Sequence, residues 1–133
     1  MSSRTWVYSK LNTGAVALLL NGGAHASTSL DDAPAEKPFI MYRGSAHLPD
    51  LRGDDALVTG TDTWMIFVHD VPGDYLQIDD VISALRAVFD NVVDQANGII
   101  RSTWLETSED FRDEDMGTIM KYCRIQVKYR SNP

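Results

Sequence analysis

Hydrophobic residues recur at the spacing of an α-helix in two segments of the chain. In the first segment, from about Ser3 to Leu20, apolar residues three and four positions apart would form one buried face. That face consists of Val7, Leu11, Ala15, Leu18 and Leu19. Ser2 or Ser3 is a suitable N-cap, and the NGG sequence at 21–23 predicts the end of the helix.

The second segment predicts the clearest helix of the chain. It follows the turn that ends at Tyr75, and it carries Asp79 and Asp80 in its first turn, where carboxylates favour the helix dipole. Asn97 and Gly98 predict its end. Its buried face is predicted to contain Ile78, Val81, Ile82, Leu85, Val88, Phe89, Val92 and Val93.

Strands are predicted where apolar residues alternate or run together between turn residues. They are residues 39–43, 62–70, 99–106 and 118–130, with a short edge strand within 24–30. Both faces of 62–70 are largely apolar, which predicts a central strand. In the last strand, the residues predicted to point inward are Cys123, Ile125, Val127 and Tyr129. The residues predicted to point outward are Arg124, Gln126, Lys128 and Arg130.

The remaining segments are predicted connections. Residues 31–38 have the prolines and charges of a surface connector, and Gly44–Thr61 is rich in turn residues and too long for a simple connection. We expect Gly44–Thr61 to be a loop that becomes ordered at an interface. The order of elements predicts one domain over 1–133 of the α+β class, with two helices packed on one face of a mainly antiparallel four- to five-stranded sheet.

Composition narrows the functional classes. The 133 residues suit a single domain, and the net charge of −7 opposes non-specific attraction to nucleic acid or anionic lipid. The only cysteine, Cys123, forms no internal disulfide and no cysteine-rich metal site. No apolar run is long enough to span a bilayer, and we interpret the partial signal-peptide pattern near the N-terminus as the first helix.

The densest cluster of charge is the acidic stretch Glu106–Gly117. It does not match a calcium-binding EF-hand loop, because a loop beginning at Asp113 would have Thr118 at its sixth position and Arg124 at its twelfth. A looser magnesium site or paired-carboxylate catalysis remains an alternative, although a solvated turn is the simpler interpretation.

Other chemistry has weak support in the sequence. A thiolate nucleophile could combine Cys123 with His69 and Asp70, but Cys123 alternates with core residues, which predicts an inert thiol. His25 and His47 show no ligand spacing. No glycine-rich phosphate loop is present, and the three tryptophans are distributed through separate elements. None of these patterns supports a catalytic or cofactor site.

Charge placement along the chain indicates a contact between copies. Every carboxylate side chain lies at or before Asp115, whereas Lys121, Arg124, Lys128 and Arg130 occupy the last predicted strand. The acidic stretch and the basic strand could pair within one molecule. Across two molecules they would form a head-to-tail contact, and such contacts close into rings.

The order of these elements resembles the tail-terminator, or tail-completion, proteins of long-tailed bacteriophages, and the resemblance covers most of the chain. The first strings that carry it follow the N-terminal helix and are Pro38-Phe39-Ile40, Tyr42-Arg43, and the Trp64–Asp70 strand running through Pro72, Gly73 and Tyr75 into Ile78-Asp79. After the amphipathic helix come Glu106-Thr107-Ser108-Glu109-Asp110, Asp113 and the closing strand from Lys121.

The resemblance implies a small α+β protomer that assembles into a ring, usually a hexamer, in the neck region of the virion tail after assembly in the host cytoplasm. Such a ring ends polymerisation of the tail tube, joins the tail to the head-closure or neck protein, and performs no chemistry. Genomic DNA would pass through it without specific binding, and no membrane would be involved. Candidate protomer or partner contacts are Asp50, Arg52, Asp54, Asp55, Glu109, Asp110, Asp113, Glu114, Asp115, Arg124, Lys128 and Arg130.

Three alternatives remain open at the level of the sequence. Another neck component, such as a head-closure or connector adaptor, would share the size and charge of a terminator. A small metal-dependent hydrolase would use the acidic stretch. A cellular adaptor domain would have no link to phage. Partner identity separates the first from a terminator, and loss of turnover without loss of fold on replacing Glu109, Asp110 and Asp113 would indicate the second.

Overall fold

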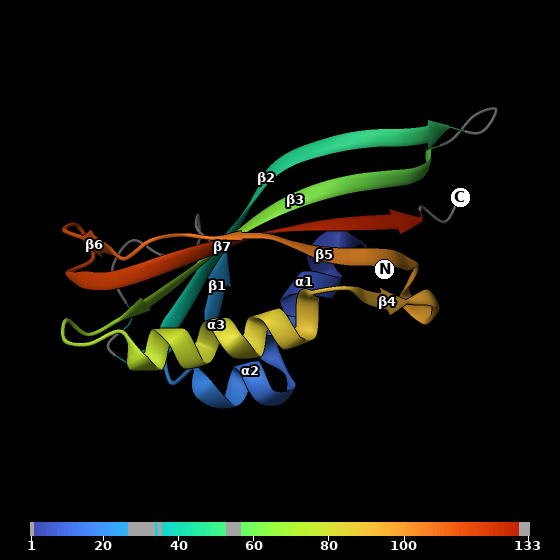
Figure 1. Cartoon of the computed structure of the whole chain (residues 1–133). Coiled ribbons are helices and arrows are strands. Elements are labelled where there is room, and N and C mark those ends of the chain that lie inside the picture. The colour runs from blue at the N-terminus through green and yellow to red at the C-terminus, as the bar shows by residue number, and fades with distance from the viewer. Residues whose placement is uncertain (1, 27–33, 35, 53–56, 131–133) are drawn as a thin grey trace.

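The computed structural model describes residues 2–26, 34, 36–52 and 57–130, and its helices and strands are drawn in Figure 1. The helices are α1 (Ser3–Asn12), α2 (Gly14–Leu19), α3 (Leu76–Phe89) and the short 3₁₀ helix η1 (Gln95–Asn97). The strands are β1 (Ala24–Ala26), β2 (Phe39–Arg52), β3 (Leu57–Asp70), β4 (Val92–Asp94), β5 (Ile99–Thr107), β6 (Phe111–Asp113) and β7 (Thr118–Arg130).

The strands form one sheet in the order β1-β2-β3-β7-β5-β4, and β6 pairs with β7. Among the described strands, β1 and β2 pair in parallel, and the other pairings are antiparallel. The α+β class is confirmed, but the described residues contain three α-helices and seven strands instead of two helices and four to five strands. The sequence missed β4 and β6 because each has only three residues, too few for an alternating pattern.

The N-terminal helical segment is two helices, which corrects the prediction of one. Thr13 is extended and Gly14 adopts a left-handed φ of +67°, so the chain changes direction between α1 and α2. Ser2 caps α1 as predicted, since its side chain accepts a hydrogen bond from the Thr5 amide. Before the break the predicted buried face is confirmed, but after it Leu18 is 85% exposed and Val16 is buried.

The second predicted helix ends earlier than expected. α3 stops at Phe89, and Asn91 adopts a positive φ of 55°, which turns the chain into β4. Val92 and Val93 therefore belong to a strand, and Gly98 ends η1 instead of α3. The first part of the predicted buried face is confirmed, because Ile78, Val81, Leu85 and Phe89 are fully or almost fully buried.

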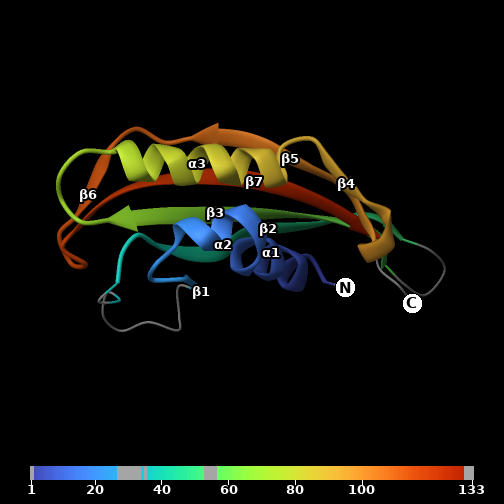
Figure 2. The same cartoon turned by 90° about the horizontal axis from the view of Figure 1, so that it is seen from below.

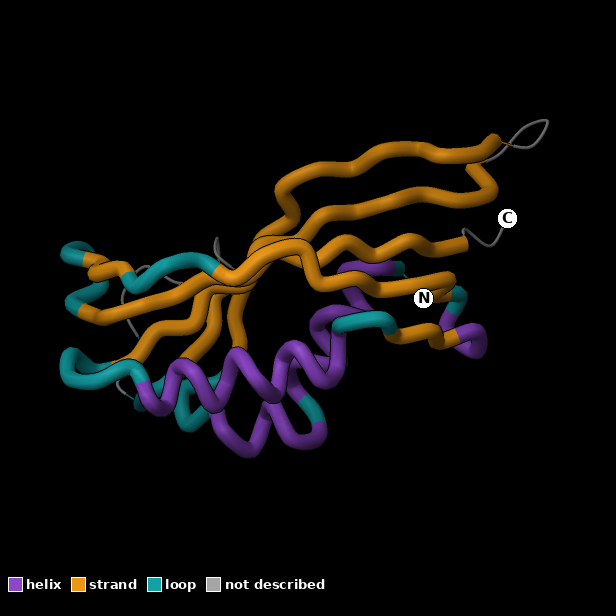
Figure 3. The backbone as a smooth tube through the Cα atoms, in the orientation of Figure 1, coloured by secondary structure: helices purple, strands orange, loops and turns teal. Residues whose placement is uncertain are grey.

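The prediction of a loop over Gly44–Thr61 was wrong for most of that segment. β2 continues to Arg52 and pairs with β3 from Leu57, so the described part of this segment forms a long β-hairpin. Figure 3 shows this hairpin extending away from the helices. Three register irregularities lie along β2, and beyond Tyr42 no described strand pairs with its outer side. A bulged edge strand accepts the glycine and proline residues that made the segment look like a loop.

The three α-helices cover one face of the sheet, as Figures 1 and 2 show from two directions. The core between the layers contains side chains from every long element, and Trp6 of α1 packs edge-to-face on Phe89 of α3 with ring centroids 5.7 Å apart. Ile40, Ile66, Val68, Cys123, Ile125 and Val127 line the sheet side of this core and are fully buried. β3 is central and Cys123, Ile125 and Val127 point inward, as predicted.

The connection between α2 and β2 is held closely at Gly22. Its amide donates to the Pro38 carbonyl over 3.0 Å, and a Cβ atom at this position would lie 2.2 Å from the Glu36 carbonyl oxygen. Glycine is therefore required here by close backbone approach, and it fixes β1 beside β2. Ala24–Ala26 confirms the short edge strand; the rest of the predicted 24–30 segment and most of the 31–38 connector lie outside the described residues.

Candidate functional site

The sheet face opposite the helices, which we call the open face, carries a cluster of apolar side chains. Directly opposed residues in neighbouring strands share a face, so the register defines three rows across this surface. The rows are Phe39–His69–Met120–Phe111, Met41–Phe67–Tyr122 and Arg43–Met65–Arg124–Glu106. Phe67 and Tyr122 pack with ring centroids 5.7 Å apart, and Phe111 and Tyr122 at 5.9 Å.

The open face contains a groove of about 320 Å³, which we call the methionine groove. It is lined by Met41, Arg43, Phe67, His69, Asp113, Met116 and Met120. The three methionines and Phe67 are half-buried, so they still present apolar surface to solvent. Flexible, polarizable methionine side chains are common at protein-binding surfaces. The sequence contains a signal for this groove, because both parities of 62–70 are apolar, but the same pattern also predicts a strand that is buried on both faces.

His69 lies at the buried end of the methionine groove and is a structural residue. Its ring stacks on Phe39 with centroids 4.8 Å apart, and its Nδ1 lies 2.8 Å from the Thr118 hydroxyl. The side chain is 2% exposed, and burial lowers the pKa of His69, although the nearby Asp113 carboxylate acts in the opposite direction. A neutral, hydrogen-bonded ring therefore fills this part of the face.

The acidic stretch surrounds β6 at one end of the sheet, and we call Glu109, Asp110, Asp113, Glu114 and Asp115 the acidic tip. Part of its charge is paired within the molecule: Lys121 Nζ lies 3.3 Å from Asp110 and 2.7 Å from Asp79 of α3. These hydrogen bonds, first of all the bond to Asp79, raise the pKa of Lys121. Asp113 Oδ1 accepts from the Met116 amide over 3.0 Å, so the acidic tip directly borders the methionine groove.

The opposite end of the open face is basic, and we call Arg101, Lys128 and Arg130 the basic end. Arg101 and Lys128 are directly opposed in the register of β5 and β7, and all three side chains are exposed. Like charges facing each other across strands are destabilising. Among the described side chains, none of the three forms an ion pair, although the Arg101 guanidinium bonds to the Asn91 side chain.

The remaining predicted interface residues belong to neither the acidic tip nor the basic end. Arg124 pairs with Glu106 at 3.3 Å inside the open face, so part of the predicted complementarity is satisfied within the molecule. Asp50 and Arg52 lie on β2, in a part of the strand for which only the backbone is described, and Asp54 and Asp55 lie outside the described residues. The structure therefore brings Glu109–Asp115 together and separates them from Lys128 and Arg130 along β7.

A second, polar cavity of about 600 Å³ lies between α1 and the β2–β3 hairpin. Asp62 accepts hydrogen bonds from the Ser3 hydroxyl and contacts His47 Nδ1, and the same nitrogen lies 3.3 Å from the Tyr129 hydroxyl. These residues are distant in sequence, and no spacing in the chain pointed to them. A serine nucleophile needs the imidazole between hydroxyl and carboxylate, whereas here the carboxylate is in the middle. The cluster joins α1, β2, β3 and β7.

The other candidate reactive groups do not form a site. Cys123 is fully buried, and burial raises the pKa of its thiol far above the ordinary value. Ile66 is the cross-strand neighbour of Cys123 in β3, whereas His69 is paired with Met120 and lies on the open face. Among the described residues no three histidine, cysteine or carboxylate side chains converge to hold a metal ion. None of the described helices is long and apolar enough to cross a membrane.

The fold and its surfaces define a small α+β protein whose distinctive features are a sheet face that no described helix covers and ends of opposite charge. Among solved structures, the fold is similar to that of a chain in the virion of a native gene transfer agent particle. The two share 15% sequence identity with a TM-score of 0.69, over 94% of this chain and 92% of that chain. The likeness is one of fold. No family model and no curated protein matches the sequence.

Proposed function

We propose that this protein is a structural component of a tailed phage or phage-like virion, and that it forms the ring at the head-proximal end of the tail tube. The observation that carries the proposal is the likeness of fold, over nearly the whole of both chains, to a chain of a gene transfer agent virion. The resemblance of the sequence to tail-terminator proteins supports the position in the tail. The ring would end tube polymerisation and join the tail to the neck.

The distribution of surface features supports assembly from identical copies. A ring requires heterologous contacts, in which each copy uses two different surfaces. The acidic tip and the basic end are such a pair of unlike surfaces, and they lie at opposite ends of β7. The proposed role uses contact surfaces alone and needs no cofactor, no metal and no catalytic residue.

The proposal is tested by measuring the mass of the purified chain, with native mass spectrometry or light scattering, over a range of concentration and salt. The measurement is repeated with the purified tail-tube protein of the same particle. We expect a closed ring, alone or on the tube end, and shorter tubes when the protein is present during polymerisation. A monomer that ignores tube protein would contradict the proposal. A ring that binds the head-closure protein but leaves tube length unchanged would indicate the connector alternative.

A further inference from the structure

The methionine groove is an apolar surface with an acidic border. Met41, Phe67, Met116 and Met120 line it, none of the described helices lies above them, and Asp113 belongs to its wall. Of the other carboxylates of the acidic tip, Glu109 and Asp110 precede β6, and Glu114 and Asp115 are exposed in the turn between β6 and β7. A partner that covers this surface must therefore bring apolar side chains together with positive charge.

The basic end of the same chain combines apolar side chains with positive charge. Lys128 and Arg130 are exposed, and Arg130 lines a third cavity of about 460 Å³ together with Val93 and Ile100. Val93 is 47% exposed, which is unusual for a valine in a described strand of this protein. The opposed Arg101 and Lys128 repel each other, and a carboxylate placed between them would remove that repulsion.

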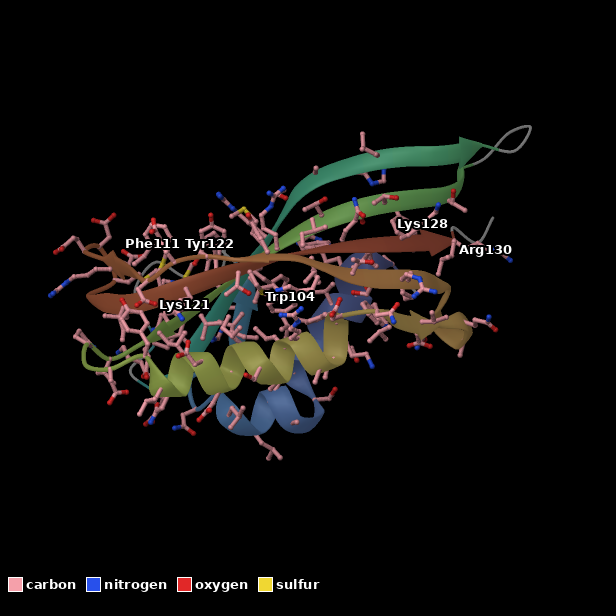
Figure 4. All side chains as sticks on the ribbon, in the orientation of Figure 1. Trp104, Phe111, Lys121, Tyr122, Lys128 and Arg130 are labelled. Atoms are coloured by element: carbon pink, nitrogen blue, oxygen red, sulfur yellow. The ribbon has the colours of Figure 1, made fainter. Side chains whose placement is uncertain are left out.

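Figure 4 shows how far apart the two surfaces are: Phe111, Tyr122 and Lys121 lie at the β6 end, and Lys128 and Arg130 at the other end. β7 has 13 residues, so at roughly 3.3 Å per residue its two ends, one beside the acidic tip and the other carrying Arg130, lie about 40 Å apart. One molecule cannot bring both surfaces together. We propose that the methionine groove and acidic tip of one copy bind the basic end of the next copy, which deepens the proposed function and rests on it.

A second copy suits these surfaces better than nucleic acid does. The phosphate backbone needs a basic surface, whereas the basic end contains only three described cations, one of which, Arg130, lines a cavity together with Val93 and Ile100. The whole chain carries a net charge of −7, which opposes approach to DNA. The apolar residues of the groove and of the basic end, and their opposite charges, complement each other directly.

The test exchanges the charges of the two surfaces in the full-length chain. An acidic-tip variant carries Glu114→Lys and Asp115→Lys, and a basic-end variant carries Lys128→Glu and Arg130→Glu. We expect each variant alone to weaken assembly at least tenfold, measured by native mass spectrometry and sedimentation with and without tube protein. An equimolar mixture of the two should restore assembly, because at every contact of an alternating ring opposite charges then meet again.

The matched control carries Glu36→Lys and Asp80→Lys, two exposed carboxylates outside both surfaces with the same change of charge. It should assemble like the natural sequence, and circular dichroism should show that every variant is folded. A mixture that fails to restore assembly would overturn the inference. So would variants that assemble normally but lose tube-protein or DNA binding, since these surfaces would then serve another partner. If the unchanged protein forms no ring and ignores tube protein, the proposed function itself fails.

The apolar half of the contact is tested separately. Met41→Gln with Met116→Gln places near-isosteric polar side chains in the groove, and it should weaken assembly at least tenfold at high salt, where charge contributes least. Leu18→Gln is the matched control, because Leu18 is 85% exposed on α2, on the helix side of the sheet. Equal assembly of the groove variant and the control would show that the groove is not part of the contact.

Discussion

At the scale of single residues, His69 combines burial with a titratable side chain. Burial lowers its pKa, so the unfolded chain, where histidine titrates near about 6.5, binds more protons at mildly acidic pH. The contribution of neutral His69 to the unfolding free energy is therefore complete above pH about 6.5 and is lost as the pH falls below that value. Protonation would place a charge between Phe39 and Thr118, where the Asp113 carboxylate would offset it in part.

We predict that His69→Gln, which can still hydrogen-bond Thr118, reduces the loss of unfolding free energy between pH 7.5 and pH 5. Urea unfolding of both proteins at several pH values measures this difference. Above pH 7.5 the plots of unfolding free energy against pH should run parallel for the two proteins, because His69 is neutral there in both the folded and the unfolded chain. Profiles that remain parallel down to pH 5 would contradict the assignment of His69 as a buried neutral residue.

At the scale of elements, the sequence predicted those that carry their own periodic pattern. The first three turns of α3, the central strand β3 and the inward side chains of β7 follow from spacing alone, because burial on one face repeats at the period of the element. The sequence did not predict the elements whose formation depends on pairing with a neighbouring strand. The hairpin of β2 and β3 depends on cross-strand pairing through bulges, and β4 and β6 exist only because β5 and β7 supply partners.

The site was predictable to a similar extent. The acidic tip and the basic residues of β7 are visible as charge placement, and their separation along one strand follows from its length. The methionine groove was missed because its members come from β2, β3, β7 and the turn before β7, and only the strand register brings them together. The ion pair of Arg124 with Glu106 was not predicted, because the bulge in β5 that places Glu106 beside Arg124 leaves no local signal.

One element-scale contact joins α3, the acidic stretch and β7. Lys121 reaches both Asp79 and Asp110, and its side chain is 18% exposed. We predict that Lys121→Met lowers the unfolding free energy by about 1 kcal/mol, near the upper value for partly exposed ion pairs. Because these partners raise the pKa of Lys121, the contribution of its ion pairs to the unfolding free energy persists below about pH 10.4. It is lost as the pH rises above that value.

The control for Lys121 is Arg112→Met. The Arg112–Glu114 pair is separated by 3.6 Å and is largely exposed on both sides, so its removal should change stability by less than about 0.5 kcal/mol. Chemical denaturation at pH 7 compares the two variants. Equal effects of both substitutions would show that Lys121 does not tie α3 to the acidic stretch.

At the scale of the whole molecule, net charge and charge placement have different consequences. The net charge of −7 governs long-range approach, whereas the acidic tip and the basic end govern which surfaces meet at short range. A protein whose ring surrounds passing DNA benefits from the first effect, because a surface that repels phosphate does not retain the genome. In such a ring, the cations of the basic end would attract the passing DNA unless a neighbouring copy covers them.

We predict that the protein does not bind duplex DNA measurably. At 0.15 M salt, fluorescence anisotropy of a labelled 20-base-pair duplex should show no binding at protein concentrations up to about 100 µM, the weak limit of ordinary non-specific binding. The Lys128→Glu, Arg130→Glu variant, with its net charge changed from −7 to −11, should behave identically. Micromolar, salt-sensitive binding that this variant abolishes would mean that the basic end serves phosphate, and that DNA is held by the protein instead of passing it.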